Sequence, residues 1–129
     1  SMKVMLAILT VIALAVCPAA AAGADTVTYT CTYDSYSNEK GLHKVQDAFK
    51  LVFTVDKARE AARSVGPNGP IDVDLLYSPE GGLTFVEAVD GGKVLVTSID
   101  RQEKSVHSRN IILQGRVASS QYYGSCSKR

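Results

Sequence analysis

The sequence has few of the residues on which catalytic and metal sites depend. It contains only two histidines and three cysteines in 129 residues. Neither a C-x-x-C nor an H-x-x-x-H spacing is present, which argues against zinc, and Asp72 and Asp74 do not belong to an EF-hand loop. The phosphate-cradling G-x-x-x-x-G-K motif and the dinucleotide fingerprint are also missing. We therefore expect no cofactor and no metal.

A long apolar run is missing as well. The longest run, residues 4–16, has thirteen residues, whereas a membrane-spanning helix needs roughly 20. Lys3 precedes this run, and Ala22-Gly23-Ala24 behind it fits the A-x-A cleavage pattern. We interpret residues 1–24 as a signal peptide, with Ser1 as a remnant of an expression tag, and residues 25–129 as a single domain.

Two other interpretations of the leader remain open. The apolar run could serve as a membrane anchor. Cys17 could instead be the lipidated residue of a lipoprotein signal, although Val16 stands where such signals have a small residue.

The domain behind the leader lacks an excess of charge. Loss of Lys3 with the leader leaves 13 basic and 13 acidic residues. A neutral domain has no electrostatic footprint for nucleic acid or for an anionic membrane, so we expect no nucleic acid partner and membrane contact only through the leader. Export to the periplasm or the medium implies oxidising conditions, in which Cys31 and Cys126 should form a disulfide.

Alternating apolar and polar residues, which are typical of half-buried strands, make up most of the domain. The clearest run is Thr26–Tyr33, in which Cys31 lies on the apolar face. Further strands are expected at residues 48–55, 71–77, 83–89, 93–99 and 106–117, the last one broken near Gly115. Residues 34–42 are polar and predict a loop. Asp56–Val65 has apolar residues at helical spacing and predicts one short helix, with an irregular strand near residues 62–65 as the alternative.

These patterns predict an all-β fold, a small antiparallel up-and-down barrel or sandwich with one short helix and one disulfide. Consecutive strands joined by short turns favour the up-and-down order. A Cys31–Cys126 bridge would bring the first strand to the C-terminal tail, and a closed barrel requires the same approach. We therefore favour closure over an open sandwich.

The hairpin at residues 83–99 has apolar residues on both faces. Asp90-Gly91 favours a two-residue turn, which would place Phe85 opposite Val96 and Glu87 opposite Val94. One face must belong to the core. The other contacts a partner or a second subunit, or is buried within the domain, so a homodimer is one expected assembly.

Few residues remain as candidates for chemistry or binding. His43 falls in the predicted loop and is expected to be solvated. A Ser–His–acid triad drawn from Ser98 or Ser108, His107 and Glu87 has no nucleophile elbow to support it, so we expect a protein that is not an enzyme. The candidate binding residues are Tyr122, Tyr123, His107, Arg109 and Glu87. The two tyrosines next to Cys126 act either as contact residues or as a plug at the barrel mouth.

The chain resembles two groups of exported proteins. Y-T-C at residues 29–31, G-G-L-T-F-V-E at 81–87, V-H-S-R at 106–109 and S-Q-Y-Y-G-S-C at 120–126 are similar to a group of short exported bacterial β proteins, a resemblance that brings no activity. Tyr29-Thr30-Cys31 and Cys126 also resemble the frame of the periplasmic inhibitors of c-type lysozyme, which are small disulfide-bonded β-barrels. The inhibitory S-G-x-x-Y segment of that family has no counterpart near residues 80–100, so no inhibitory residue is carried over.

Together these observations predict a small exported non-catalytic binding protein of the bacterial cell envelope. Its partner would be an unknown protein or a small apolar ligand. The alternative is an inhibitor of a cell-wall hydrolase, similar to the lysozyme inhibitors.

Overall fold

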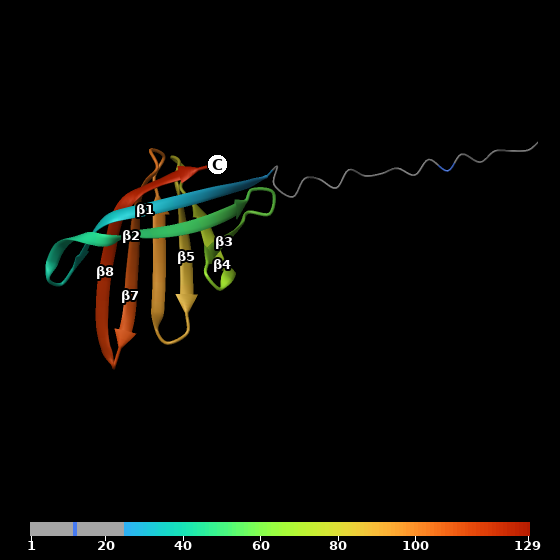
Figure 1. Cartoon of the computed structure of the whole chain (residues 1–129). Helices are drawn as coiled ribbons and strands as arrows, with labels where there is room; N and C mark the ends of the chain where they lie inside the picture. Colours follow the sequence, from blue (N-terminus) through green and yellow to red (C-terminus); the bar gives the residue numbers. More distant parts are fainter. Residues whose placement is uncertain (1–11, 13–24) are drawn as a thin grey trace, which may run out of the picture.

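The chain forms a closed barrel of eight antiparallel strands that follow one another around the wall (Figure 1). The structure is a computed structural model that describes Ile12 and residues 25–129. The strands are β1 (Thr26–Asn38), β2 (Gly41–Asp56), β3 (Ala61–Gly66), β4 (Gly69–Tyr77), β5 (Leu83–Val89), β6 (Lys93–Ile99), β7 (Lys104–Leu113) and β8 (Arg116–Lys128). The predicted antiparallel barrel is confirmed. The predicted signal peptide, with Cys17, lies outside the described residues except for Ile12.

The first and last strands close the barrel, as the cysteine positions predicted. Cys31 and Cys126 are direct partners in the pairing of β1 with β8, and their sulfur atoms form a disulfide. Arg129 and Thr28 extend this pairing by exchanging two backbone hydrogen bonds of 3.0 Å. The bridge joins residues 95 positions apart, a closure that chain-entropy models value at about 4 to 5 kcal/mol.

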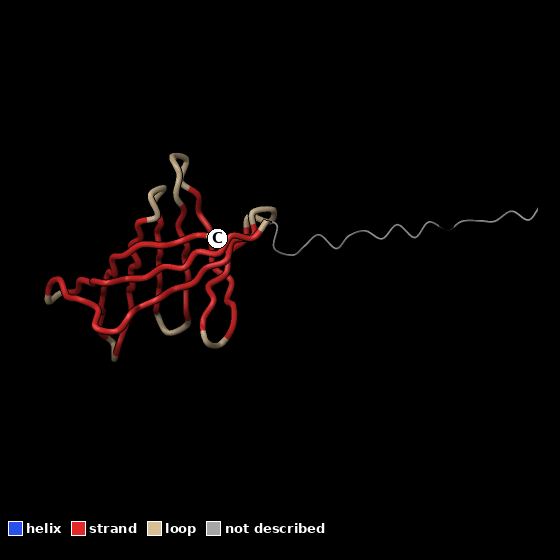
Figure 2. The backbone as a smooth tube through the Cα atoms, turned by 45° about the horizontal axis from the view of Figure 1, so that its top comes forward, coloured by secondary structure: helices blue, strands red, loops and turns tan. Residues whose placement is uncertain are grey.

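The predicted helix at Asp56–Val65 is wrong, and the strand alternative is closer. β2 runs to Asp56, a turn occupies residues 57–60, and β3 begins at Ala61. Among the described residues there is no helix (Figure 2), and none therefore that could cross a membrane. The Asp56 carboxylate accepts a hydrogen bond from the Arg59 N–H, which resembles a helix cap but here closes a turn. The alanine side chains of this segment would bury too little apolar area to hold a helix against the core. As a strand, the segment buries Ala62 in the barrel core.

The predicted loop at residues 34–42 is also wrong. β1 continues to Asn38 and β2 begins at Gly41, so the two strands form one long hairpin. The register of β1 shifts between Tyr33 and Ser35, which makes Asp34 a bulge residue. After the bulge, the inward and outward positions of β1 are shifted by one residue. Because of this shift and the polar composition, the sequence pattern did not indicate a strand here.

The hairpin formed by β5 and β6 has a different register from the predicted one. Val89 pairs with Lys93 across a three-residue turn, in which Gly91 and Gly92 have φ angles of 91° and 78°. Phe85 consequently faces Thr97 rather than Val96, and Glu87 faces Leu95 rather than Val94. One extra turn residue moves every β6 side chain to the opposite face, so Leu95, Thr97 and Ile99 point inward while Val94 and Val96 point outward.

The two ends of the barrel differ in how continuously their strands are paired. We call the end with the turns at residues 57–60, 78–82 and 100–103 the closed end, and the end with the other turns the open end. Towards the open end the wall is interrupted, because β2 pairs with β3 only from Val52 to Asp56 and β4 pairs with β5 only from Asp74 to Tyr77.

The core lies in the closed half of the barrel. Its buried apolar residues are Cys31, Tyr33, Phe53, Val55, Ala62, Leu83, Phe85, Ile99 and Cys126. On β4 only Val73 and Leu75 pack against this cluster. Ile71 and Tyr77 alternate with these two residues on the same face of β4, but they are about half exposed because they lie near the ends of the strand. The position of the core therefore leaves the open end free of a tightly packed interior.

Candidate functional site

The interior of the closed half is filled by side chains. The enclosed cavity next to the core has a volume of about 20 Å³ and is lined by residues that include Phe85, Glu87, Leu95, Thr97 and His107. That volume holds about one water molecule. Within the described residues, this cavity is therefore too small for a substrate or an apolar ligand.

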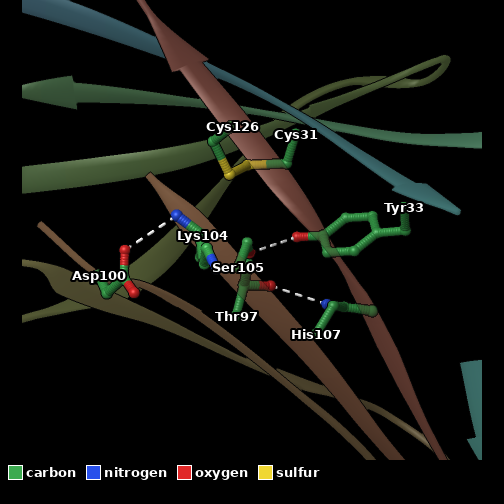
Figure 3. Close-up of a disulfide and its surroundings, with 8 residues drawn as sticks. All are labelled: Cys31, Tyr33, Thr97, Asp100, Lys104, Ser105, His107 and Cys126. Carbon is green, nitrogen blue, oxygen red and sulfur yellow. Dashed lines mark hydrogen bonds between the residues drawn. A yellow bond between two sulfur atoms is a disulfide. The ribbon is translucent and has the colours of Figure 1, made fainter. Parts of the chain in front are cut away.

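Two buried polar pairs border the disulfide (Figure 3). Tyr33 Oη and Ser105 Oγ lie 2.8 Å apart, and Thr97 Oγ1 lies 2.7 Å from His107 Nδ1. Burial raises the pKa of the Tyr33 phenol, although its hydrogen bond to Ser105 opposes this shift. Both pairs satisfy polar groups that would otherwise be costly to bury.

His107 is enclosed rather than available for catalysis. It is 3% exposed, and burial lowers its pKa to about 4, with a further contribution from the positive charges of Arg109 and Lys93. It is therefore neutral at pH 7. Ser108, next to His107 on β7, and Ser98, next to its partner Thr97 on β6, face outward, so neither serine can join His107 in a Ser–His–acid arrangement.

The inner face carries charged side chains towards the open end. Glu87, Leu95 and Arg109 occupy one row across β5, β6 and β7, and Lys93 follows on the same face of β6. All four are half-buried. Inward-pointing charges are tolerated here because the interrupted wall admits solvent.

An aromatic stack fastens the β1–β2 hairpin to β8 at the open end. The Tyr36 ring stacks on His43 at a centroid distance of 5.0 Å and on Tyr122 at 5.4 Å. Tyr122 also contacts Phe49 at 4.6 Å. The prediction of a solvated loop position for His43 is wrong, since His43 lies on β2 and its Nε2 is 3.2 Å from Asn38 Oδ1.

The five predicted binding residues do not form one site. Glu87, His107, Arg109 and Tyr122 lie on the inner face, where the rings of His107 and Tyr122 are 6.0 Å apart. Tyr123 lies on the outer face. The Tyr122 ring packs partly into the core, as a plug would, whereas the Tyr123 hydroxyl contacts Ser37 Oγ at 2.9 Å and donates to Gln121 Oε1 at 3.1 Å.

The outer surface of β6, β7, β8 and the end of β1 carries few charges: Lys104 at the start of β7 and the exposed Asp34 at the bulge of β1 border a stretch of uncharged side chains. We call this surface the uncharged face. Its outward residues are Val94, Val96, Ser98, Val106, Ser108, Asn110, Ile112, Val117, Ser119, Gln121, Tyr123, Ser35 and Ser37. By contrast, the outward positions of β2, β3 and β4 include Lys50, Arg63, Asp72 and Asp74, with an Arg63–Asp72 ion pair of 3.0 Å.

A groove crosses the uncharged face at the open end. It lies between the tip of the β1–β2 hairpin and the outer surface of β6, β7 and β8, and its volume is about 620 Å³. We call it the tip groove. Its lining includes Asn38, Glu39, Val96, Ser108, Asn110, Ser119 and Gln121. A second groove of about 470 Å³ runs past Tyr123 and Gly124 towards the closed end.

Sequence reasoning missed the tip groove. The signal was present in the alternation of residues 106–112 and 117–123, where every second residue is uncharged. Recognising it as one surface required the pairing of β8 with both β7 and β1, together with the bulge at Asp34.

Comparisons of this chain with protein-family profiles, with curated proteins and with solved structures find no match. Among the described residues, no three His, Cys, Asp or Glu side chains are grouped so that they could hold a metal ion.

Proposed function

We propose that this protein is a small exported non-catalytic binding protein of the bacterial cell envelope, and that it binds its partner through the uncharged face. The observation that carries the proposal is the run of uncharged outward side chains on four neighbouring strands, bordered by Asp34 and Lys104, in a chain of which 21% is charged. Small soluble domains usually have charged residues at about 25 to 35% of their surface, and depletion of charge marks the centre of interfaces.

The filled interior supports recognition on the outside. A cavity of about 20 Å³ leaves no room for a ligand inside the closed half. The proposal therefore favours a partner that lies against the barrel wall over a small apolar ligand inside it. Tyr123 lies on this wall, and tyrosine is a common contact residue because its ring offers area and its hydroxyl offers a hydrogen bond.

The non-catalytic part of the proposal is supported by the placement of the titratable groups. His107 is enclosed and hydrogen-bonded to Thr97, the buried Ser105 is paired with Tyr33, and Ser98 and Ser108 point to the other side of the sheet. Export is supported by the disulfide, because bonds of this kind persist mainly in oxidising compartments.

A charge placed on the uncharged face should separate binding from folding. We expect the protein to sediment with isolated bacterial envelope fractions, and Ser108→Lys to lower the bound fraction at least about tenfold, because a desolvated unpaired charge costs several kcal/mol. Ala61→Lys is the matched control, since Ala61 is exposed on β3 in the charged half of the surface. Thermal unfolding should be alike in all three proteins. Failure of the unmodified protein to sediment with any envelope fraction would refute the proposal.

A second function, inhibition of a cell-wall hydrolase, has one observation in its favour. The bridge between the first and last strands of a small barrel matches the frame of the lysozyme inhibitors that the sequence resembles. Lysis of bacterial cell walls by c-type lysozyme should then slow when the protein is added. No effect at micromolar concentration would remove this candidate.

A further inference from the structure

We infer that the tip groove binds a neutral oligosaccharide. The inference rests on the proposed function and narrows the partner to the glycan component of the envelope. The polar groups in the groove, the charge of its lining and its size each favour this class of ligand.

A chain of hydrogen bonds orients Gln121 towards the groove. The Tyr123 hydroxyl donates its single proton to Gln121 Oε1, so the 2.9 Å contact with Ser37 requires the serine hydroxyl to donate to Tyr123 Oη. The carbonyl oxygen of Gln121 is thereby engaged. Its N–H₂ group has no acceptor among the described residues and is available as a donor.

Asn38 is fixed in the same way on the opposite wall of the groove. Asn38 Oδ1 accepts a hydrogen bond from the Lys40 N–H at 2.9 Å and lies 3.2 Å from His43 Nε2. The stacking of His43 on Tyr36 holds the imidazole in place. The Asn38 amide N–H₂ has no acceptor among the described residues, and it belongs to a side chain whose orientation is already set; preorganised groups lose less entropy on binding.

The remaining lining suits hydroxyl groups. Ser108, Asn110 and Ser119 each donate and accept hydrogen bonds, and none forms a side-chain hydrogen bond within the part of the chain that the structure describes. Sugar hydroxyls likewise both donate and accept. Val96 adds an apolar surface between them, which suits the C–H face of a sugar ring.

The charge and the volume of the groove restrict the ligand further. Glu39 is the one charged residue among those that line it, so an anionic ligand would meet a carboxylate and no compensating cation. The carboxylate of Glu39 can accept hydrogen bonds from two sugar hydroxyls. The volume of about 620 Å³ lies within the range of roughly 300 to 1,000 Å³ that is usual for small-molecule sites.

Calorimetric titration with chitotetraose, a neutral tetramer of N-acetylglucosamine, tests the inference. We expect saturable binding by the unmodified protein, and a loss of affinity of about 5- to 10-fold in Gln121→Ala, because one oriented donor is removed. Tyr123→Phe should lower the affinity by a smaller factor, since it releases Gln121 without removing it. Gln46→Ala, an exposed glutamine on β2, is the matched control and should bind as the unmodified protein does. A sulfated hexose tetramer should not bind.

The outcomes separate this inference from the proposed function. Equal affinity of Gln121→Ala and the unmodified protein would show that the sugar binds elsewhere and would overturn the inference. Absence of chitotetraose binding by a protein that still sediments with the envelope would overturn the inference and leave the proposed function in place. Absence of both would overturn the two together.

Discussion

The closed end and the open end of this barrel are built from the same eight strands but differ in almost every physical property. At the closed end the wall is continuous, the disulfide joins β1 to β8, and the inner side chains are buried. At the open end the wall is interrupted beside β3 and β4, and inward residues such as Glu87 and Arg109 are half-buried and charged.

This difference indicates a division of labour. Stability in a small domain comes mainly from buried apolar area and cross-links, and both are concentrated at the closed end. Recognition needs accessible groups with set orientations, and the open end offers them in the tip groove. Substitutions at the two ends should therefore have effects of different size and kind.

The largest effect is expected from a pair of glycine substitutions. In Gly124→Ala the new Cβ would overlap the carbonyl oxygen of Thr32, where β8 pairs with β1 next to the disulfide. We expect a loss of more than about 4 kcal/mol or a failure to fold. Gly66→Ala at the β3–β4 turn meets no atom within 4 Å, and we expect a change within about 0.5 kcal/mol. Urea denaturation of the two variants measures both values, and equal stability would contradict the comparison.

The next largest effect is expected from removal of the disulfide. The double variant Cys31→Ala with Cys126→Ala should be less stable by about 2 to 5 kcal/mol, because the unfolded chain loses its cross-link and two core side chains become smaller. Denaturation midpoints under oxidising conditions measure the loss. A folded variant with an unchanged midpoint would show that closure of the barrel does not depend on the bridge.

A smaller effect is expected from His107, which lies where the buried core gives way to the open end. Its pKa of about 4 in the folded protein is below the usual 6.5, so the unfolded chain takes up the proton first as the pH falls. Stability should therefore decrease between about pH 6.5 and pH 4 and level off below, by up to about 3 kcal/mol. In His107→Gln this contribution disappears. The difference in unfolding free energy between the two proteins across that pH range is the measurement, and a parallel pair of curves would refute the assignment.

Much of the closed end could be predicted from the sequence, because alternation within single strands and the positions of the two cysteines indicate its structure. The alternation of residues 26–33 placed Cys31 on the inner face, and the position of Cys126 near the chain end predicted both the bridge and barrel closure. The register of β6 was wrong by one residue, because Asp90-Gly91 favours a two-residue turn while the following Gly92 adds a third turn residue.

The open end could not be predicted, because its structure depends on contacts between residues that are far apart in the sequence. The polar stretch at residues 34–42 forms strand through its pairing with β8, where Tyr36 lies opposite Tyr122, a residue far away in the sequence, and stacks on it. The tip groove likewise depends on the contact of Ser37 with Tyr123, which are 86 positions apart. Glu87, Arg109 and Tyr122 were candidate binding residues, and the sequence did not indicate which face of the wall they occupy.

The most direct test of this division is an NMR titration of the backbone amides with chitotetraose. The account predicts concentration-dependent shifts at Asn38, Ser108 and Gln121 around the tip groove, and unchanged resonances at Cys31 and Cys126. Shifts centred on the closed end, or no shifts at any sugar concentration, would contradict it.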